Sequence, residues 1–353
     1  MSAHIDVTPW LEKLESAIEP DWEREKLAAW KRLLAFEPPG KPFPAEGARP
    51  GGREPRPGEW PRFLINDAIR DPRKMLLREL GAAWDAVCRR APAMLNIRAN
   101  LGTGILPSTL GGEIFWMEDA LDTLPTARPG EGDALGRLLA AGEPDIRSGQ
   151  GGQVFDLAAY FQQALAPYPR IREAVWIYHP DLQGPVDVLE LLIGSRMFLD
   201  FLDRPDDVKA ALDRVTRTYE RFMERWLAQV PDSVRDGYSA HWGLLIKGGV
   251  ALRDDSLVNL SPAIHAEFVR PYDDRLLARF GGGMIHFCGR GVHCVPAMAE
   301  SPALHAVHVS QPHLNDMTAL LATVKASGKF LYVARHRNGL DGLDLSADLH
   351  KVA

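Results

Sequence analysis

From residue 94 onward, short apolar runs alternate with longer amphipathic segments, and this alternation constrains the fold more than any other feature. The runs are rich in Val, Ile, Leu and aromatic residues and cover residues 94–97, 114–117, 175–178, 250–252 with 257–260, 284–287, 306–309 and 330–333. Helical spacing of apolar residues marks many of the segments between them, at residues 186–202, 205–228, 264–280, 295–300 and 317–327. Alternating strands and helices build βαβ units around a largely parallel sheet. Without a nucleotide-binding fingerprint, six to eight such units favour an α/β fold of the (β/α)8 TIM-barrel type over a doubly wound sheet.

The first 90 residues predict an N-terminal helical extension. Apolar residues recur at three- and four-residue spacings over residues 9–36, with a break or kink expected at Pro20. A Pro/Gly-rich stretch then runs to Pro61, either as a linker or as a fixed loop over the protein. Residues 65–90 predict a second helix. We expect residues 91–353 to form the barrel, and the extension and barrel to make one structural domain.

Composition excludes several classes of protein. The 353 residues include 41 Lys and Arg against 47 Asp and Glu, a net charge of −6, so no basic nucleic-acid-binding face is expected. The 3 cysteines, Cys88, Cys288 and Cys294, are too few for a disulfide framework and fit a reducing cytoplasm. No signal peptide and no run of about 18 apolar residues is visible, so we expect a cytoplasmic protein without a membrane span.

In such a barrel, the chemistry lies where the strands end and in the loops that follow. Six of the 11 histidines fall at these positions. The polar side chains found there include Arg98, Asn100, His179, Asp181, Gln183, His241, Asp254, Asp255, His286, Cys288, His308, His313 and His336. This enrichment predicts a site built from several strand ends.

The sharpest candidate within this set is the segment GGGMIHFCG at residues 281–289. His286 and Cys288 are two apart in a predicted strand, so their side chains point to the same side, about 6.5–7 Å apart along the chain. A nitrogen and a sulfur ligand suit zinc, whereas the alternative is a buried His beside a Cys that acts as a small hydrophobe. This spacing does not supply a third ligand. Cys294 is either that ligand or the start of the next helix.

Carboxylates form a second group of candidates. Asp254 and Asp255 follow the run at 250–252, and paired carboxylates at a strand end can serve as acid and base. A helix cap or a loop-ordering role is the alternative for at least one of them. Asp181 and Gln183 lie in the turn HPDLQGP at residues 179–185, where they either face a pocket or belong to a capped loop.

Taken together, these loops resemble the uroporphyrinogen decarboxylase superfamily over residues 66–338. The segments that carry the resemblance are NLGTGI at 100–105, DLQGPVD at 181–187, FLDRP at 201–205, DD at 254–255 through SP at 261–262, FVRPY at 268–272 and HFCG at 286–289. The resemblance implies a (β/α)8 barrel with a funnel-shaped active site. Relatives continue through a further strand, so we expect this chain to lack the last βα unit, which makes a homodimer worth testing.

The superfamily contains porphyrinogen decarboxylases and zinc-dependent methyltransferases that serve corrinoid proteins or thiol acceptors. The decarboxylases carry an N-terminal Arg-Gln-Ala-Gly-Arg-Tyr motif that this sequence lacks. In the methyltransferases, the His and Cys that correspond to His286 and Cys288 are two of the zinc ligands. Their third ligand is a Cys after the last strand. This chain has no Cys beyond Cys294, so we assign His336 as the third ligand. The alternatives are His308, an acidic residue, a partner subunit, or a site that binds no metal.

The resemblance therefore predicts methyl transfer, in which zinc held by neutral His286 and thiolate Cys288 lowers the pKa of an incoming thiol acceptor. The methyl group would come from a corrinoid on a partner protein or from another activated donor. The alternatives are decarboxylation of a porphyrinogen-like or other polycarboxylate substrate, and a non-catalytic barrel that binds a small molecule or a partner protein. In these schemes the catalytic residues are Asp255 and Asp181, and the substrate-binding residues are Arg98, Asn100, Gln183, His241 and His308.

Overall fold

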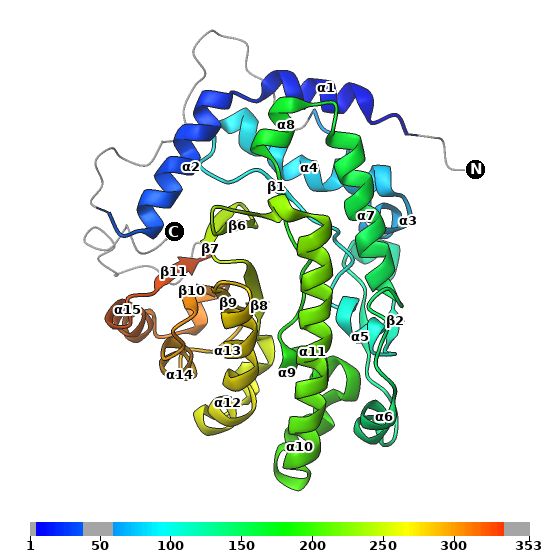
Figure 1. The fold of residues 1–353 in the computed structure, drawn as a ribbon, viewed down its shortest axis with the longest axis vertical. Coiled ribbons are helices and arrows are strands. Elements are labelled where there is room, and N and C mark those ends of the chain that lie inside the picture. The colour runs from blue at the N-terminus through cyan, green and yellow to red at the C-terminus, as the bar shows by residue number, and fades with distance from the viewer. Residues whose placement is uncertain (1–4, 38–58, 335–353) are drawn as a thin grey trace.

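Parallel strands form the framework of the molecule, as the alternation predicts (Figure 1). The computed structural model describes residues 5–37 and 59–334. Four strands pair in parallel in the order β11-β10-β9-β8: β8 (Val250–Arg253), β9 (Gly283–Phe287), β10 (Leu304–Val309) and β11 (Phe330–Val333). A second parallel pair consists of β1 (Asn96–Ile97) and β4 (Trp176–Ile177).

The loop after β4 joins these two parallel sheets. The backbone N–H of Gly184 donates to the carbonyl oxygen of Arg253 at 2.7 Å, and the N–H of Ala251 donates to Nε2 of His179 at 3.1 Å. The edges of β4 and β8 are therefore adjacent. Within the described residues, the parallel sheets contain six strands, so the structure establishes a mixed α/β fold but not a closed eight-stranded barrel.

Two of the predicted strands differ from the prediction. The run at 114–117 contributes to β2 (Glu113–Phe115), which pairs in antiparallel fashion with β3 (Thr126–Arg128) and leaves Phe115 and Trp116 exposed. The run at 257–260 overlaps a 3-10 helix, η4 (Asp255–Asn259), because Asp254 ends the strand and the chain turns. In both places the apolar residues do not extend the parallel sheet: Phe115 and Trp116 face solvent, whereas Leu257 and Leu260 pack into the main core.

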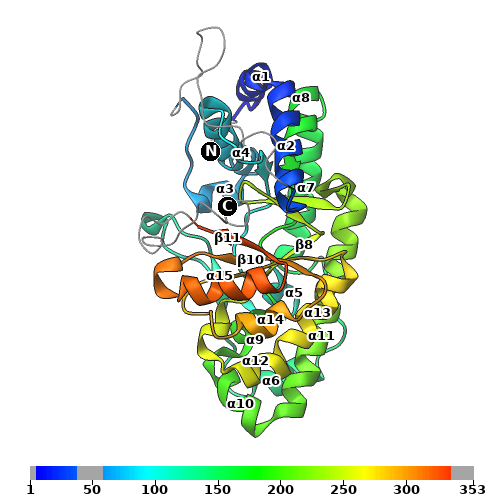
Figure 2. The ribbon, with the colours of Figure 1, turned by 90° about the vertical axis from the view of Figure 1, so that its left-hand side faces the viewer.

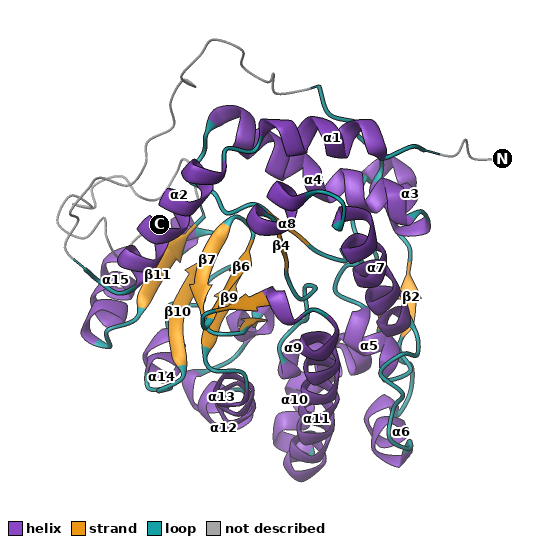
Figure 3. Cartoon of the chain, turned by 45° about the horizontal axis from the view of Figure 1, so that its top comes forward, coloured by secondary structure: helices purple, strands orange, loops and turns teal. Residues whose placement is uncertain are grey.

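Helices surround the strands (Figure 3). Those before β1 are α1 (Thr8–Ala17), α2 (Pro20–Leu34), α3 (Ile65–Arg70) and α4 (Pro72–Arg89). Those between β1 and β8 are α5 (Ile105–Thr109), α6 (Ala134–Ala140), α7 (Gln150–Leu165), α8 (Pro169–Ala174), α9 (Pro185–Ile193), α10 (Met197–Asp203) and α11 (Pro205–Gln229). Those after β8 are α12 (Pro262–Phe268), α13 (Arg270–Arg279), α14 (Val295–Ala299) and α15 (Met317–Ala326). No described helix combines the length and the hydropathy that a bilayer span requires.

Helices precede β1, and the predicted break at Pro20 separates α1 from α2. This proline occupies the first turn of α2, where a missing N–H costs nothing. Asp71 caps α4 by accepting the N–H of Arg73 at 3.0 Å, which divides the predicted helix over 65–90 into α3 and α4. Helices α1, α2 and α8 lie across one end of the molecule, and α6, α10 and α12 lie at the other (Figures 1 and 2). Most of the Pro/Gly-rich stretch lies outside the described residues.

An antiparallel meander precedes β8 and was not predicted. It consists of β5 (Val234–Arg235), β6 (Tyr238–His241) and β7 (Leu244–Lys247). Its tip is a two-residue turn in which Trp242 and Gly243 have φ angles of 49° and 82°, as a type I′ turn requires. The carbonyl oxygen of Gly243 accepts the N–H of Met94 at 2.7 Å, which fixes the tip beside the start of β1.

The core between α7 and α11 contains a close aromatic pair. Ring centroids of Phe155 and Phe222 lie 4.8 Å apart, and both side chains are buried. We expect Phe222→Ala to lower the free energy of unfolding by about 3–5 kcal/mol, because it leaves a cavity between two helices. Leu202→Ala, at a side chain that is 75% exposed, should change it by less than about 0.5 kcal/mol. Urea denaturation measures both, and equal effects would contradict this packing.

Candidate metal centre and active site

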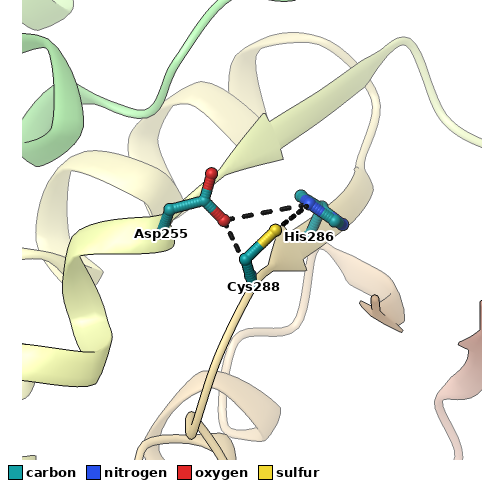
Figure 4. A group of neighbouring side chains, drawn as sticks. All are labelled: Asp255, His286 and Cys288. Carbon is teal, nitrogen blue, oxygen red and sulfur yellow. Dashed lines mark hydrogen bonds and ion pairs between the residues drawn. The ribbon is translucent and has the colours of Figure 1, made fainter. Parts of the chain in front are cut away.

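Asp255, His286 and Cys288 meet at the carboxyl ends of β8 and β9 (Figure 4). Nε2 of His286 lies 3.5 Å from Sγ of Cys288 and 3.8 Å from Oδ1 of Asp255, and all three ligand atoms lie within 4.8 Å of one another. In a tetrahedral site with bonds of about 2.0–2.3 Å, ligand atoms are roughly 3.3–3.8 Å apart. Both separations from Nε2 of His286 fall in this range, so the three side chains could hold one metal ion. No other group of three such ligands occurs in residues 5–37 and 59–334.

Strand register determines which side chains surround His286. Arg253 on β8 and His308 on β10 are its in-register neighbours, and Tyr332 on β11 is the neighbour of His308. In-register residues on adjacent strands point to the same face, so these four form one row across the sheet. Cys288 follows two residues after His286 and lies on the same side, as the spacing predicts. Asp255 reaches the group from the first turn of η4.

His286 is oriented by His308. Their Nδ1 atoms lie 2.9 Å apart, so one ring donates a proton and the other accepts it. Burial lowers the pKa of His286 to about 2 and that of His308 to about 4, and Arg253 contributes to both shifts, so both rings are neutral near pH 7. When Nδ1–H of His286 is the donor, the lone pair of Nε2 faces Cys288 and Asp255. This is the tautomer that binds a metal ion.

Cys288 is held by its neighbours and is protonated in the absence of a cation. Its Sγ accepts the hydroxyl of Ser310 at 3.0 Å, and its backbone N–H donates to Oδ1 of Asp255 at 2.7 Å. Burial, with a smaller contribution from the negative charge of Asp255, raises the pKa of the thiol to about 11. A bound metal ion would supply the positive charge that a thiolate needs here.

Asp187 on α9 positions the loop that carries Asp255. Its two carboxylate oxygens accept the N–H groups of Asp255 and Ser256 at 2.7 and 2.9 Å. Burial raises the pKa of Asp187 well above its usual value, and repulsion from Asp254 and Asp255 adds to the shift. Asp187 and Asp255 both line a cavity of about 420 Å³ at the carboxyl ends of the strands, together with Gln183.

Asp181 belongs to a different cluster, which is an ion-pair network. Arg98 donates to Oδ1 of Asp181 at 3.0 Å and to the hydroxyl of Tyr178 at 2.8 Å, and Arg253 also bonds to Asp181. Asn100 donates to Glu79 at 2.9 Å. Arg98 and Asn100 line a larger cavity of about 790 Å³ that shares no described lining residue with the first. The two predicted catalytic carboxylates therefore have different partners: Asp181 pairs with Arg98 and Arg253, whereas Asp255 belongs to the group with His286 and Cys288.

The remaining predicted site residues lie in several environments. His241 is completely buried, its ring is 4.4 Å from that of His179 and 4.5 Å from that of Tyr178, and its nitrogens have no hydrogen-bond partner among the described residues. His308 lies behind His286 and lines neither cavity. His336 lies outside the described residues.

Sequence reasoning missed Asp187, Ser310 and Trp242 as site residues. Ser310 directly follows the run at 306–309, so it is also a polar residue at the end of a predicted strand, which is the signal that identified the other candidates. Asp187 falls within a landmark segment but inside a predicted helix, and only the fold shows that it reaches the loop after β8. Trp242 enters from the hairpin tip, with its ring 5.2 Å from His286 and 5.5 Å from His308, and no sequence signal indicates this contact.

Comparison with known proteins gives a likeness at the level of the fold. No protein-family model matches the chain, and no curated protein matches it. Among solved structures, the chain is similar to a methyltransferase from Methanosarcina mazei, with a TM-score of 0.59 and 15% identity over 85% of this chain and 80% of that one. At this identity the likeness concerns the α/β fold, which this chain shares with a methyltransferase.

Protonation of His179 should destabilise the fold in acid. Burial lowers its pKa from 6.5 to about 4, and its neutral Nε2 accepts the N–H of Ala251. Between pH 6.5 and 4 the unfolded chain binds a proton that the folded chain does not, so the free energy of unfolding falls as the pH falls, by about 3 kcal/mol from this group.

His179→Gln tests this contribution. The variant should be less stable than the parent at pH 7, because the glutamine does not reproduce the imidazole contacts, and its stability should fall less steeply between pH 6.5 and 4. His313→Gln, at an exposed histidine, should keep the parental slope. Urea denaturation across this pH range measures the slopes, and identical slopes for the parent and His179→Gln would refute the assignment.

Proposed function

We propose that this protein is a zinc-dependent methyltransferase that transfers a methyl group to a thiol acceptor. The observation that carries the proposal is the Asp255, His286 and Cys288 group at the carboxyl ends of two parallel strands. The likeness in fold to a methyltransferase supports it. We further propose that the parallel strands belong to a (β/α)8 barrel of the uroporphyrinogen decarboxylase superfamily, and that the methyl donor is a corrinoid on a partner protein.

The donor set suits zinc. One imidazole nitrogen, one thiolate and one carboxylate oxygen are ligands that zinc accepts, whereas magnesium and calcium take oxygen ligands. Three protein ligands leave a fourth position for the substrate, as in catalytic zinc sites. His308 supports this assignment, because metal-binding histidines usually hydrogen-bond through their other ring nitrogen.

Zinc, when bound, supplies the positive charge that lowers the pKa of an incoming thiol. The chain contributes the orientation of the ligands. His308 fixes the tautomer of His286, Ser310 donates to the Cys288 sulfur, and Asp187 holds the loop of Asp255. In the transfer, the acceptor loses its proton to solvent, a sulfur lone pair forms the new S–CH₃ bond, and the bond from the methyl carbon to its leaving group breaks with its electron pair.

The charge of the adjoining cavity favours methyl transfer over decarboxylation of a polycarboxylate. Its described lining residues include Asp187, Glu190 and Asp255 and contain no Lys, Arg or His. A substrate with several carboxylates would meet repulsion there, because a site for such a molecule needs guanidinium or ammonium groups. Arg98, one of the arginines available to the decarboxylase alternative, is paired with Asp181, which also pairs with Arg253.

Zinc content tests the proposed function. The purified protein should bind about one zinc per chain, and His286→Ala and Cys288→Ala should each reduce this to near zero, because each variant leaves only two protein ligands. Cys88→Ala is the matched control, since Cys88 lies on α4 outside the ligand group, and it should keep the parental zinc content. Elemental analysis after dialysis against a weak chelator gives the stoichiometry. Equal, negligible zinc in the parent and all variants would refute the proposal.

A further inference from the structure

We infer that the thiol acceptor carries an amino group, and that the cavity lined by Gln183, Asp187, Glu190 and Asp255 binds this group as an ammonium ion. The inference rests on the proposed function and adds the charge of the acceptor to it. The cavity, of about 420 Å³, includes a residue of the metal-ligand group, Asp255, in its wall. A molecule that fills it is therefore next to the metal ligands.

The acidic side chains of this cavity have no cationic partner. Neither Asp187 nor Glu190 forms an ion pair with a described residue, although Asp187 is only 5% exposed. A zinc ion with Asp255 and thiolate Cys288 is electrically neutral, so it supplies no positive charge to the acidic side chains of Asp187 and Glu190. The buried carboxyl group of Asp187 lies in the same cavity wall as the half-buried Glu190, and a ligand ammonium would provide the positive charge that both lack.

Gln183 gives an independent indication of a ligand. Its side chain is 6% exposed and lines the cavity, and the described residues provide no hydrogen-bond partner for it. Its amide atoms are not closed off from solvent, so they are open to the cavity and available to a ligand. Glu190 uses Oε2 to accept the hydroxyl of Ser256, and Oε1 has no partner among the described residues. The cavity therefore offers hydrogen-bond acceptors beside negative charge.

These acceptors favour an ammonium ion that bears N–H groups over a quaternary ammonium. Quaternary ammonium ions are recognised by aromatic faces, and the described lining residues of this cavity include no Phe, Tyr or Trp. An anionic thiol would be repelled by the same carboxylates. Cysteamine is the smallest thiol with the required charge, and the volume of the cavity also admits longer aminothiols.

A cobalt-substituted protein provides the test. Binding of a thiolate to Co²⁺ produces a sulfur-to-cobalt charge-transfer absorption, so the dissociation constants of three probes are measured by titration: cysteamine, 2-mercaptoethanol and 3-mercaptopropionate. We expect cysteamine to bind at least about tenfold more tightly than 3-mercaptopropionate. The intrinsic acidities of the thiols also differ and affect their affinities. The decisive quantity is therefore the change in the ratio of the dissociation constants of 3-mercaptopropionate and cysteamine when a cavity charge is removed.

Glu190→Gln removes one negative charge while keeping the size of the side chain and an oxygen for Ser256. It should reduce the preference for cysteamine over 3-mercaptopropionate by about tenfold and leave the affinity for 2-mercaptoethanol nearly unchanged. Glu25→Gln, at an exposed glutamate of α2, is the matched control and should keep the parental ratio. An unchanged ratio in Glu190→Gln, or a parental preference for the anionic thiol, would overturn the inference and leave the proposed function intact. If no thiol produces the absorption, the proposed function itself fails.

Discussion

His286 lies on a strand that is hydrogen-bonded on both sides, and the register of these two pairings determines which side chains flank its ring across the sheet. Pairing with β8 places Arg253 beside it, and pairing with β10 places His308 beside it. A shift of either pairing by one residue would turn the neighbouring side chain to the opposite face of the sheet. The orientation of Nε2 toward Cys288 and Asp255 thus depends on backbone hydrogen bonds in the sheet as much as on the ligand residues themselves.

Burial controls the chemistry of this row of residues. Water is largely excluded from His286 and His308, so their rings stay neutral, and the thiol of Cys288 keeps its proton until a cation is present. The same exclusion of water leaves Asp187 with a raised pKa beside Asp254 and Asp255. The site therefore combines neutral nitrogen donors with an excess of acidic groups, an arrangement that is favourable when positive charge is bound and unfavourable without it.

Local sequence patterns predicted the strand ends well and the contacts between distant segments poorly. The two-residue spacing of His286 and Cys288 correctly placed both on one side of a strand, because side-chain direction alternates along an extended backbone. Asp255 comes close to His286 and Cys288 because β8 pairs in parallel with β9 and because Asp187 on α9 holds the loop after β8. Neither of these contacts has a local sequence signature. Ion pairs between distant segments also lack a local signature, so the sequence alone does not distinguish Asp181, which pairs with two arginines, from Asp255. The run at 114–117 was predicted as a barrel strand because its residues have high β propensity, but its partner is a neighbouring segment rather than the parallel sheet.

Trp242 lies between the larger cavity and the histidine pair of the candidate metal centre. Its indole borders the 790 Å³ cavity and contacts both His286 and His308, and the guanidinium of Arg253 lies 4.4 Å from its ring centre. The left-handed conformation of Trp242 in a two-residue turn leaves its backbone little freedom to adjust. Displacement of the indole by an occupant of the larger cavity would therefore be transmitted to the histidine pair. Because such coupling acts equally in both directions, loading of the metal centre would also alter the affinity of the larger cavity for its occupant.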